Sequence, residues 1–276
     1  MMKAVALIGQ TVVLMIVFAA VACLADWPRY RQLPQQSAVV KLSFTHGASR
    51  KADCRKRTPE ELAKLMRLGT KIRDDLKVPV MLVNSESETM GCFPCRQPDT
   101  GKFRFWEVAG SSHGPQGMSD LMEQKTRRDG VFTNPFEGAR PSIVMWSPAA
   151  DAALVHVKRW IEGGAPPPSQ PRIAVSGNPP GIERDQHGIA RGGVRLPDVE
   201  VPISSNSGYN GAAGLEALTG STEPFSRETI KALYPNHQDY VAKVTAAAQS
   251  ARETGVILPR AERDYIERAK AAHIPS

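Results

Sequence analysis

Two apolar runs restrict the fold of this chain more than any other feature of its sequence. Val78–Val83 is continuously apolar, as in a strand that is covered on both faces in a parallel sheet. Phe103–Ala109 alternates in character, and residues 84–102 between the two runs are enough for a short crossover. We therefore expect two neighbouring parallel strands in a protein of the α/β class.

Titratable side chains follow each of these runs. Glu86 and Glu88 come after the first run, and His113 comes after the second. Open α/β sheets place their chemistry at the carboxyl ends of their strands, where such residues meet. A histidine beside a carboxylate holds one tautomer and shuttles a proton from a serine. Taken alone, the same residues are also compatible with a turn histidine and two solvated charges.

The chain divides into three stretches of different character. We expect residues 1–25 to be a signal peptide or an N-terminal anchor. Residues 26–77 form an N-terminal segment with one short strand, Ala38–Thr45, and one helix that begins at a capping residue, Thr58. Residues 78–276 form the main domain.

The N-terminus carries the clearest targeting signal. Lys3 precedes a mainly apolar run, Ala4–Ala22, whose last three residues are the small ones that signal peptidase requires. We predict export to the periplasm or the medium. Two alternatives stay open, a lipoprotein processed at Cys23 and an uncleaved membrane anchor, because the run is just long enough to span a bilayer.

Two cysteines, Cys92 and Cys95, are separated by Phe93 and Pro94. In an exported protein a disulfide is the usual state of such a pair, so we expect the two to lie close enough for a structural bridge, with idle thiols as the alternative. A thioredoxin-like pair would open a helix, and Pro98 argues against a long helix here. Two thiols are also incomplete as zinc ligands.

The rest of the main domain alternates between turn-rich and helical stretches. Residues 115–148 are polar and irregular, which suggests a long loop or lid. Residues 170–220 are rich in Gly, Pro and Asn, with short extended pieces such as Val199–Ile203. The periodicity predicts four helices, at residues 149–162, 226–233, 237–253 and 259–272.

Composition excludes several classes of function. The net charge is +7, but much of the excess lies in one cluster, Arg50–Arg57, and aromatic residues make up only 6% of the chain. This argues against a nucleic-acid partner. The cluster is either a solvated basic loop or a contact for an anionic surface. The sequence has no phosphate-binding glycine loop, no metal-ligand spacing and no nicotinamide fingerprint, so we expect no cofactor.

Five blocks in the main domain resemble a known family in the same order. The blocks are Glu86-Ser87-Glu88, CFPCRQPDTGKFRFWEVAGSSHG, VHVKRWIEGGAPPP, DQHGIARGGVRLPDVEVP and GSTEPFSRETIKALYPNHQDY. Together they are similar to the C-terminal half of the bacterial α/β-hydrolase-domain family, over Val78–Ser276. The resemblance implies an α/β-hydrolase fold, esterase-like chemistry, and a catalytic order of nucleophile, acid and histidine.

The resemblance also implies roles for three residues. His113 matches the family's histidine in its Gly-x-x-His turn. Glu88 occupies the position where the family usually has an aspartate after a glutamate, and Glu86 matches that preceding glutamate. We favour Glu88 over Glu86 as the acid.

The nucleophile is where the chain departs from the family. No Gly-x-Ser-x-Gly elbow occurs before Val78, and the nearest approach, Gly47–Lys51, lacks the second glycine. Ser111 and Ser112 adjoin His113, so we do not expect them to reach its ring productively. The stretch between the signal and Val78 is also too short for the strands that should precede it.

We therefore expect a partial α/β-hydrolase fold with esterase-like, Ser-His-acid chemistry that is incomplete in this chain alone. If the site is active, its substrate is a small ester-like molecule; the sequence leaves open whether a partner chain supplies the nucleophile. The alternatives are a non-catalytic exported binding module and a truncated gene fragment in which residues 1–77 are not native to the family.

Overall fold

The computed structural model describes residues 15–16, 71–72, 75–130, 140–212 and 216–274. The expected strand Ala38–Thr45, the helix from Thr58 and the basic cluster Arg50–Arg57 lie outside the described residues. Of the apolar N-terminal run, only Met15–Ile16 is described. None of the helices in the described residues is long and apolar enough to cross a membrane.

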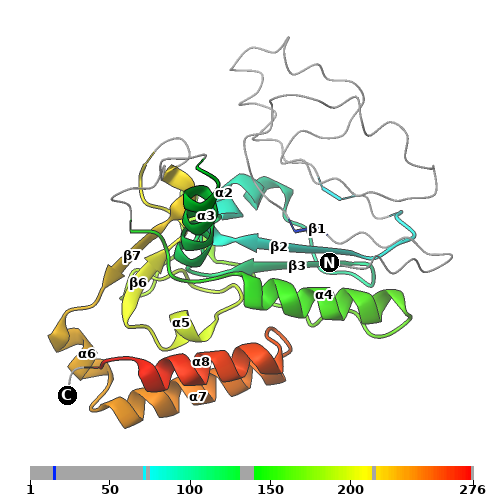
Figure 1. The fold of residues 1–276 in the computed structure, drawn as a ribbon. Helices are drawn as coiled ribbons and strands as arrows, with labels where there is room; N and C mark the ends of the chain where they lie inside the picture. The colour runs from blue at the N-terminus through cyan, green and yellow to red at the C-terminus, as the bar shows by residue number, and fades with distance from the viewer. Residues whose placement is uncertain (1–14, 17–70, 73–74, 131–139, 213–215, 275–276) are drawn as a thin grey trace.

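A three-stranded parallel sheet forms the centre of the fold (Figure 1). Strand β2, Val80–Ser85, pairs in parallel with β3, Phe103–Val108, with Leu82 opposite Phe105. This confirms the two neighbouring parallel strands expected from the sequence. A two-residue strand, β1 at Met15–Ile16, pairs in parallel with the other edge of β2.

The apolar side chains of the two long strands are buried on both faces of the sheet. Met81, Val83 and Trp106 belong to the main core, and Phe103 and Phe105 belong to a smaller cluster on the other face. A strand covered on both sides gains about 25 cal/mol for each Å² of apolar surface buried, which explains the nearly unbroken apolar sequence.

Helix α4, Ser147–Ile161, packs against β2 and covers the main-core face of the sheet. It corresponds to the helix predicted at residues 149–162. Proline at position 148 fits the first turn, where its missing amide hydrogen costs nothing. The buried positions of α4 are mostly alanine, which lets the helix approach the strands closely.

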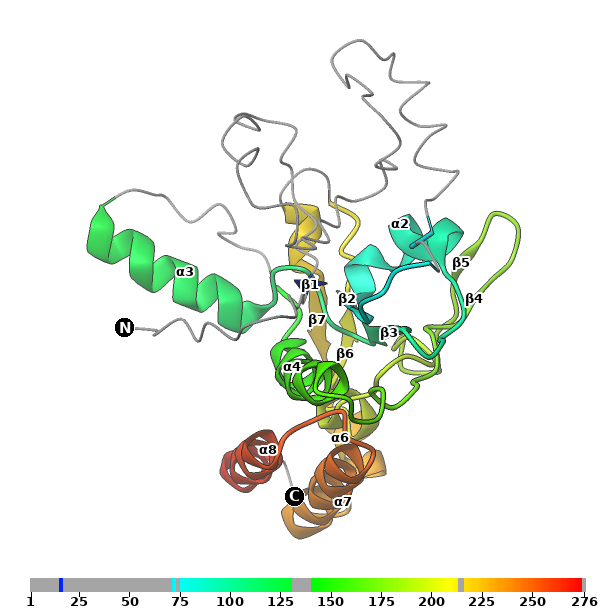
Figure 2. The ribbon, with the colours of Figure 1, turned by 90° about the vertical axis from the view of Figure 1, so that its right-hand side faces the viewer.

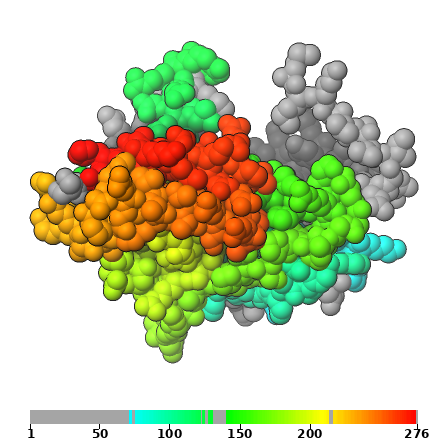
Figure 3. All heavy atoms as spheres, turned by 90° about the horizontal axis from the view of Figure 1, so that it is seen from below, coloured from blue at the N-terminus to red at the C-terminus, as the bar shows by residue number. Residues whose placement is uncertain are grey.

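The three predicted C-terminal helices are present, as α6 (Arg227–Leu233), α7 (His237–Glu253) and α8 (Pro259–Ala271). The cap of α7 is local, because the Asn236 side chain accepts a hydrogen bond from the Asp239 amide at 2.9 Å. Figure 3 shows α7 and α8 side by side along one face of the molecule, with α4 next to them.

The prediction of a loop or lid over residues 115–148 is wrong for the first part of this segment. Residues Gln116–Asp129 form a helix, α3, which projects from the body of the fold (Figure 2). The segment is rich in good helix formers, and Arg127 pairs with Glu123 one turn earlier, so a charged helix forms without a broad apolar stripe.

Short elements fill the turn-rich region, as predicted, with one difference. Val199 and Glu200 lie in a short helix, α5 (Pro197–Glu200), rather than in an extended piece, because Pro197 fits the first helical turn. The other elements are two antiparallel hairpins, β4 (Val175–Ser176) with β5 (Gly181–Ile182) and β6 (Ser204–Ser207) with β7 (Ser221–Pro224), and a 3₁₀ turn, η5 (Glu216–Thr219).

Candidate active site

A histidine and a carboxylate meet beyond the carboxyl ends of β2 and β3. His113 Nδ1 lies 3.0 Å from Glu88 Oε1. The Glu88 side chain is 3% exposed and the His113 side chain 12% exposed, so water screens their interaction only weakly. The structure therefore brings together the histidine and the favoured acid of the sequence analysis.

Local structure positions the Glu88 carboxylate. Three 3₁₀ residues, Glu86–Glu88 (η3), follow β2 directly, and Ser85 precedes them as the capping residue. Glu88 Oε2 accepts hydrogen bonds from the Ser85 amide at 2.7 Å and from Ser85 Oγ at 2.5 Å. One carboxylate oxygen is thus fixed to the end of the strand, and the other faces the histidine ring.

The backbone of His113 is held by side chains from two other segments, and one of these is anchored to a third. Its amide donates to Ser87 Oγ at 3.0 Å, and Ser87 Oγ donates to the Gly208 carbonyl at 2.8 Å. The His113 carbonyl accepts a hydrogen bond from Trp146 Nε1 at 3.4 Å. These contacts place the ring from outside its own turn.

The arrangement determines which nitrogen of His113 is basic. A carboxylate only accepts hydrogen bonds, so Nδ1 carries the proton that is donated to Glu88. In the neutral ring the lone pair then lies on Nε2. This is the tautomer of a general base that takes a proton from a hydroxyl nucleophile.

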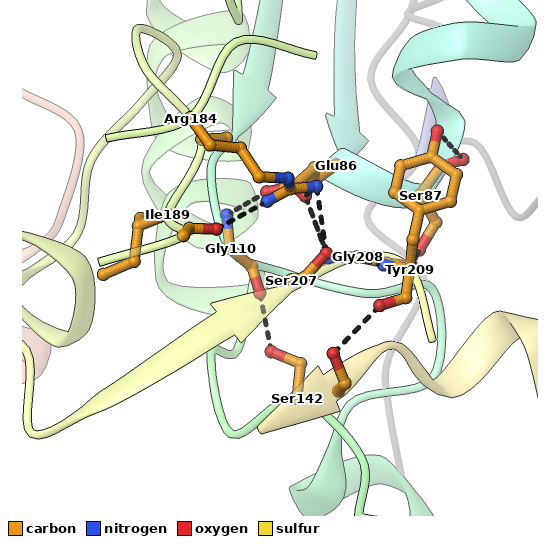
Figure 4. Close-up of polar contacts among 12 residues, drawn as sticks. Glu86, Ser87, Gly110, Ser142, Arg184, Ile189, Ser207, Gly208 and Tyr209 are labelled. Carbon is orange, nitrogen blue, oxygen red and sulfur yellow. Dashed lines mark hydrogen bonds and ion pairs between the residues drawn. The ribbon is translucent and has the colours of Figure 1, made fainter. Parts of the chain in front are cut away.

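Glu86, the alternative acid, has a different role in the structure. Its side chain is fully buried, and it accepts hydrogen bonds from the Gly110 amide at 2.7 Å and the Gly208 amide at 3.1 Å (Figure 4). Glu86 Oε1 also forms an ion pair with Arg184 Nη2 at 2.7 Å and accepts a hydrogen bond from Ser207 Oγ at 3.2 Å. The described partners of Glu86 are therefore structural groups, and Glu88 is the carboxylate that faces the histidine.

One serine pattern escaped the sequence analysis. Residues Gly110–Gly114 read Gly-Ser-Ser-His-Gly, which matches Gly-x-Ser-x-Gly with Ser112 at its centre, between β3 and α3. The side chain of Ser112 is fully buried, and its Oγ has no hydrogen-bond partner among the described residues. Ser111 Oγ donates to the Val108 carbonyl at 2.7 Å. This turn therefore presents a histidine, while its two serines point into the fold.

Cys92 and Cys95 are both thiols in the structure, so the bridge expected from the sequence is not formed. Cys92 ends helix α2, Thr89–Cys92, and Cys95 ends the following 3₁₀ turn η4, Phe93–Cys95. Among the described residues, no three side chains of His, Cys, Asp or Glu come together as metal ligands.

The parallel sheet and the histidine–carboxylate pair at its strand ends are typical of α/β hydrolases. The family model described as "Alpha/beta hydrolase domain" matches residues 34–267, most of the chain, and the chain belongs to this family. Comparison with curated proteins and with solved structures gave no match. Because the match begins at residue 34, the hypothesis that residues 1–77 are foreign to the family is wrong for residues 34–77.

Proposed function

We propose that this chain carries the acid and the histidine of an esterase-type site, with Glu88 orienting His113 for carboxylic ester hydrolysis. The observation that carries this proposal is the 3.0 Å separation of His113 Nδ1 and Glu88 Oε1 at the edge of a parallel sheet. Membership of the hydrolase family supports the same reaction class.

The chemistry follows from the tautomer of His113. As a hydroxyl oxygen attacks the ester carbonyl carbon, Nε2 takes the hydroxyl proton and the ring becomes an imidazolium. Glu88 stabilises that positive charge from the Nδ1 side. The same proton then passes to the departing alcohol oxygen, and water repeats the sequence to release the acid.

The hydroxyl nucleophile is the part that we place outside this chain, on a partner chain. The burial of Ser112 and the absence of an elbow sequence before Val78 support this assignment. Loss of the nucleophile from a catalytic triad costs on the order of a million-fold in rate. We therefore expect the chain alone to hydrolyse simple aryl esters little faster than buffer.

The test compares p-nitrophenyl acetate hydrolysis by the natural chain, His113→Ala and His273→Ala. His273 is an exposed histidine near the C-terminus and serves as the matched control. We expect a small excess rate over buffer that is lost in His113→Ala and kept in His273→Ala. We also expect no serine to be labelled by a fluorophosphonate.

Two results would contradict this proposal in different ways. An excess rate that is unchanged in His113→Ala would show that His113 takes no part in the hydrolysis. Rapid turnover abolished by His113→Ala, together with phosphonate labelling of Ser49 or Ser112, would show that the chain is a complete enzyme.

A non-catalytic binding module is the second candidate, and one observation favours it. An open groove of about 730 Å³ lies between α7 and the residues around α5, and neither His113 nor Glu88 lines it. Arg195 and Lys243 line this groove, but both are already paired, with Glu200 at 2.7 Å and Asp239 at 2.8 Å. The groove therefore offers little uncompensated charge to a ligand, and we rank binding second.

Export is proposed separately, from the apolar run Ala4–Ala22. Cleavage after Ala22 would remove Met15–Ile16, the strand that pairs with the edge of β2. N-terminal sequencing of protein recovered from the periplasm should begin at Cys23. Recovery of a chain that still contains Met15–Ile16 would contradict cleavage and favour the anchored form.

A further inference from the structure

Cys92 and Cys95 form a close pair of partly exposed thiols on the helical turns that follow η3. They stand three positions apart, at the end of α2 and the end of the 3₁₀ turn η4. In a 3₁₀ turn, side chains at this spacing eclipse each other. A 3₁₀ turn rises about 2.0 Å per residue, so positions three apart are separated by about 6 Å, which is within the Cα range that a disulfide requires.

The surroundings make the two sulfurs unequal. A hydrogen bond from the Cys92 thiol lowers the pKa of Cys95 to about 7, and the Arg96 guanidinium acts in the same direction. Burial and the Glu107 carboxylate oppose this shift. The hydrogen bond with Cys95, together with burial, raises the pKa of Cys92. Cys95 is therefore the sulfur that ionises first.

One contact of Cys95 favours its protonated form. Cys95 Sγ lies 2.9 Å from the Cys92 carbonyl oxygen, and only the thiol can donate to that oxygen. The pair also ends a helical run, whereas a thioredoxin-like pair begins one. Here the neighbouring thiol, rather than a helix N-terminus, stabilises the thiolate.

We propose that Cys92 and Cys95 are a thiol–disulfide exchange site whose substrates are low-molecular-weight disulfides such as oxidised glutathione. The arrangement that carries this proposal is a pair of partly exposed thiols three positions apart on one 3₁₀ turn, with Cys95 Sγ held 2.9 Å from the Cys92 carbonyl oxygen. This activity is separate from ester hydrolysis and uses neither His113 nor the missing nucleophile.

The exchange balances in two steps. The Cys95 thiolate attacks one sulfur of the small disulfide, its S–S bond breaks, and one thiolate leaves and takes up a proton from solvent. Cys92 then loses its proton and attacks the Cys95 sulfur, which releases the second small thiol. The protein loses two electrons and two hydrogens, and the small disulfide is reduced to two thiols.

The first test is a redox titration of the full chain with Cys23→Ser and Cys54→Ser, which removes the other two cysteines. The protein is equilibrated in mixtures of reduced and oxidised glutathione, alkylated and analysed by mass spectrometry. We expect the pair to change reversibly between dithiol and disulfide as the ratio of reduced to oxidised glutathione is varied. A pair that stays reduced in oxidised glutathione, or stays bridged in reduced glutathione, would overturn the proposal.

The second test identifies the attacking sulfur by the pH dependence of iodoacetamide alkylation. With Cys92 present, Cys95 should reach half of its maximal rate at a pH of about 7. Cys92→Ala removes the largest cause of that shift and should move the midpoint toward 9.0, the ordinary value. At pH 7 the thiolate fraction then falls about 50-fold while its nucleophilicity rises about 10-fold, so alkylation slows about 5-fold.

Cys95→Ala is the matched control, because it leaves Cys92 as the only thiol of the pair. In that variant Cys92 should react more slowly at neutral pH than Cys95 does in Cys92→Ala. Equal reactivity of the two single-cysteine variants, or an unchanged midpoint for Cys95 in Cys92→Ala, would overturn the assignment. Both tests read the thiols directly, so a failure of the proposed ester hydrolysis does not affect them.

Discussion

Glu86 Oε2 accepts a hydrogen bond from the Gly110 amide at 2.7 Å, which joins the turn after β2 to the turn after β3. Its other carboxylate oxygen contacts Arg184 and the Gly208 amide, so one buried charge connects segments that are far apart in the sequence. Glu86 thereby holds the two turns that carry Glu88 and His113 at a fixed separation.

Removal of this buried charge should destabilise the protein strongly. We expect Glu86→Ala to lower the free energy of unfolding by about 3 kcal/mol, because Arg184 and two backbone amides lose their partner. Arg184 is 29% exposed, so water screens part of its charge and limits the loss.

Urea denaturation of Glu86→Ala against Glu162→Ala measures this difference. Glu162 pairs with Lys158 on the surface, and its removal should cost about 0.3–0.5 kcal/mol. Similar losses in the two variants would show that Glu86 is not an organising residue.

Glu88 should determine the tautomer of His113. In Glu88→Ala the Nδ1 proton loses its carboxylate acceptor, whereas Glu88→Gln keeps a carbonyl oxygen that can accept it. Nitrogen-15 NMR of the imidazole should therefore show the Nδ1–H form in the natural chain and in Glu88→Gln. That form should be lost in Glu88→Ala and kept in Glu183→Ala, which changes an exposed carboxylate. An unchanged spectrum in Glu88→Ala would show that Glu88 does not determine the tautomer of His113.

Gly208 should tolerate no side chain. A Cβ atom there would lie 2.5 Å from the Ser87 nitrogen and 2.8 Å from the Ser111 oxygen, both of which belong to the backbone. We expect Gly208→Ala to lower the free energy of unfolding by about 1–3 kcal/mol. Gly101→Ala is the control, because a Cβ at Gly101 meets nothing within 4 Å. Equal thermal denaturation midpoints for the two variants would refute the close contact.

The contribution of Glu107 to stability should fall as the pH rises, which is the reverse of the usual behaviour of a paired carboxylate. Burial raises the pKa of Glu107 above its ordinary value of 4.5, although Arg96 lies 2.6 Å away and acts against the shift. A raised folded-state pKa means that the folded protein binds the proton more tightly than the unfolded chain does. This carboxyl group therefore contributes most stability below pH 4.5, and its contribution falls as the pH rises through the folded pKa.

Glu107→Gln isolates that contribution, because glutamine has nearly the same shape and does not titrate. The unfolding free energy of the natural chain minus that of Glu107→Gln should decrease from about pH 4 to about pH 8, as measured by urea denaturation. A difference that increases with pH over this range would contradict the shift.

The elements with strong local signals were predictable from the sequence. Strands β2 and β3 have buried apolar runs, and α7 has a capping side chain and a helical period, so nearby residues determine their structure. Parallel pairing of the two strands then requires that Glu88 and His113 emerge at the same edge. Helix α3 was missed because its propensity is high but its apolar stripe is weak.

The division of roles between Glu86 and Glu88 was decided only by the tertiary structure. Both carboxylates follow the same strand, and only the family resemblance favoured Glu88, because the local physical pattern of the two residues is the same. The distinction arises because Arg184 and Gly208, distant in sequence, pack over the end of β2 and take Glu86 as their partner. The burial of Ser112 also depends on a distant segment, because Gly220 packs closely against the Ser112 Cβ atom. Contacts of this kind form only when segments far apart in the sequence are brought together by the whole fold.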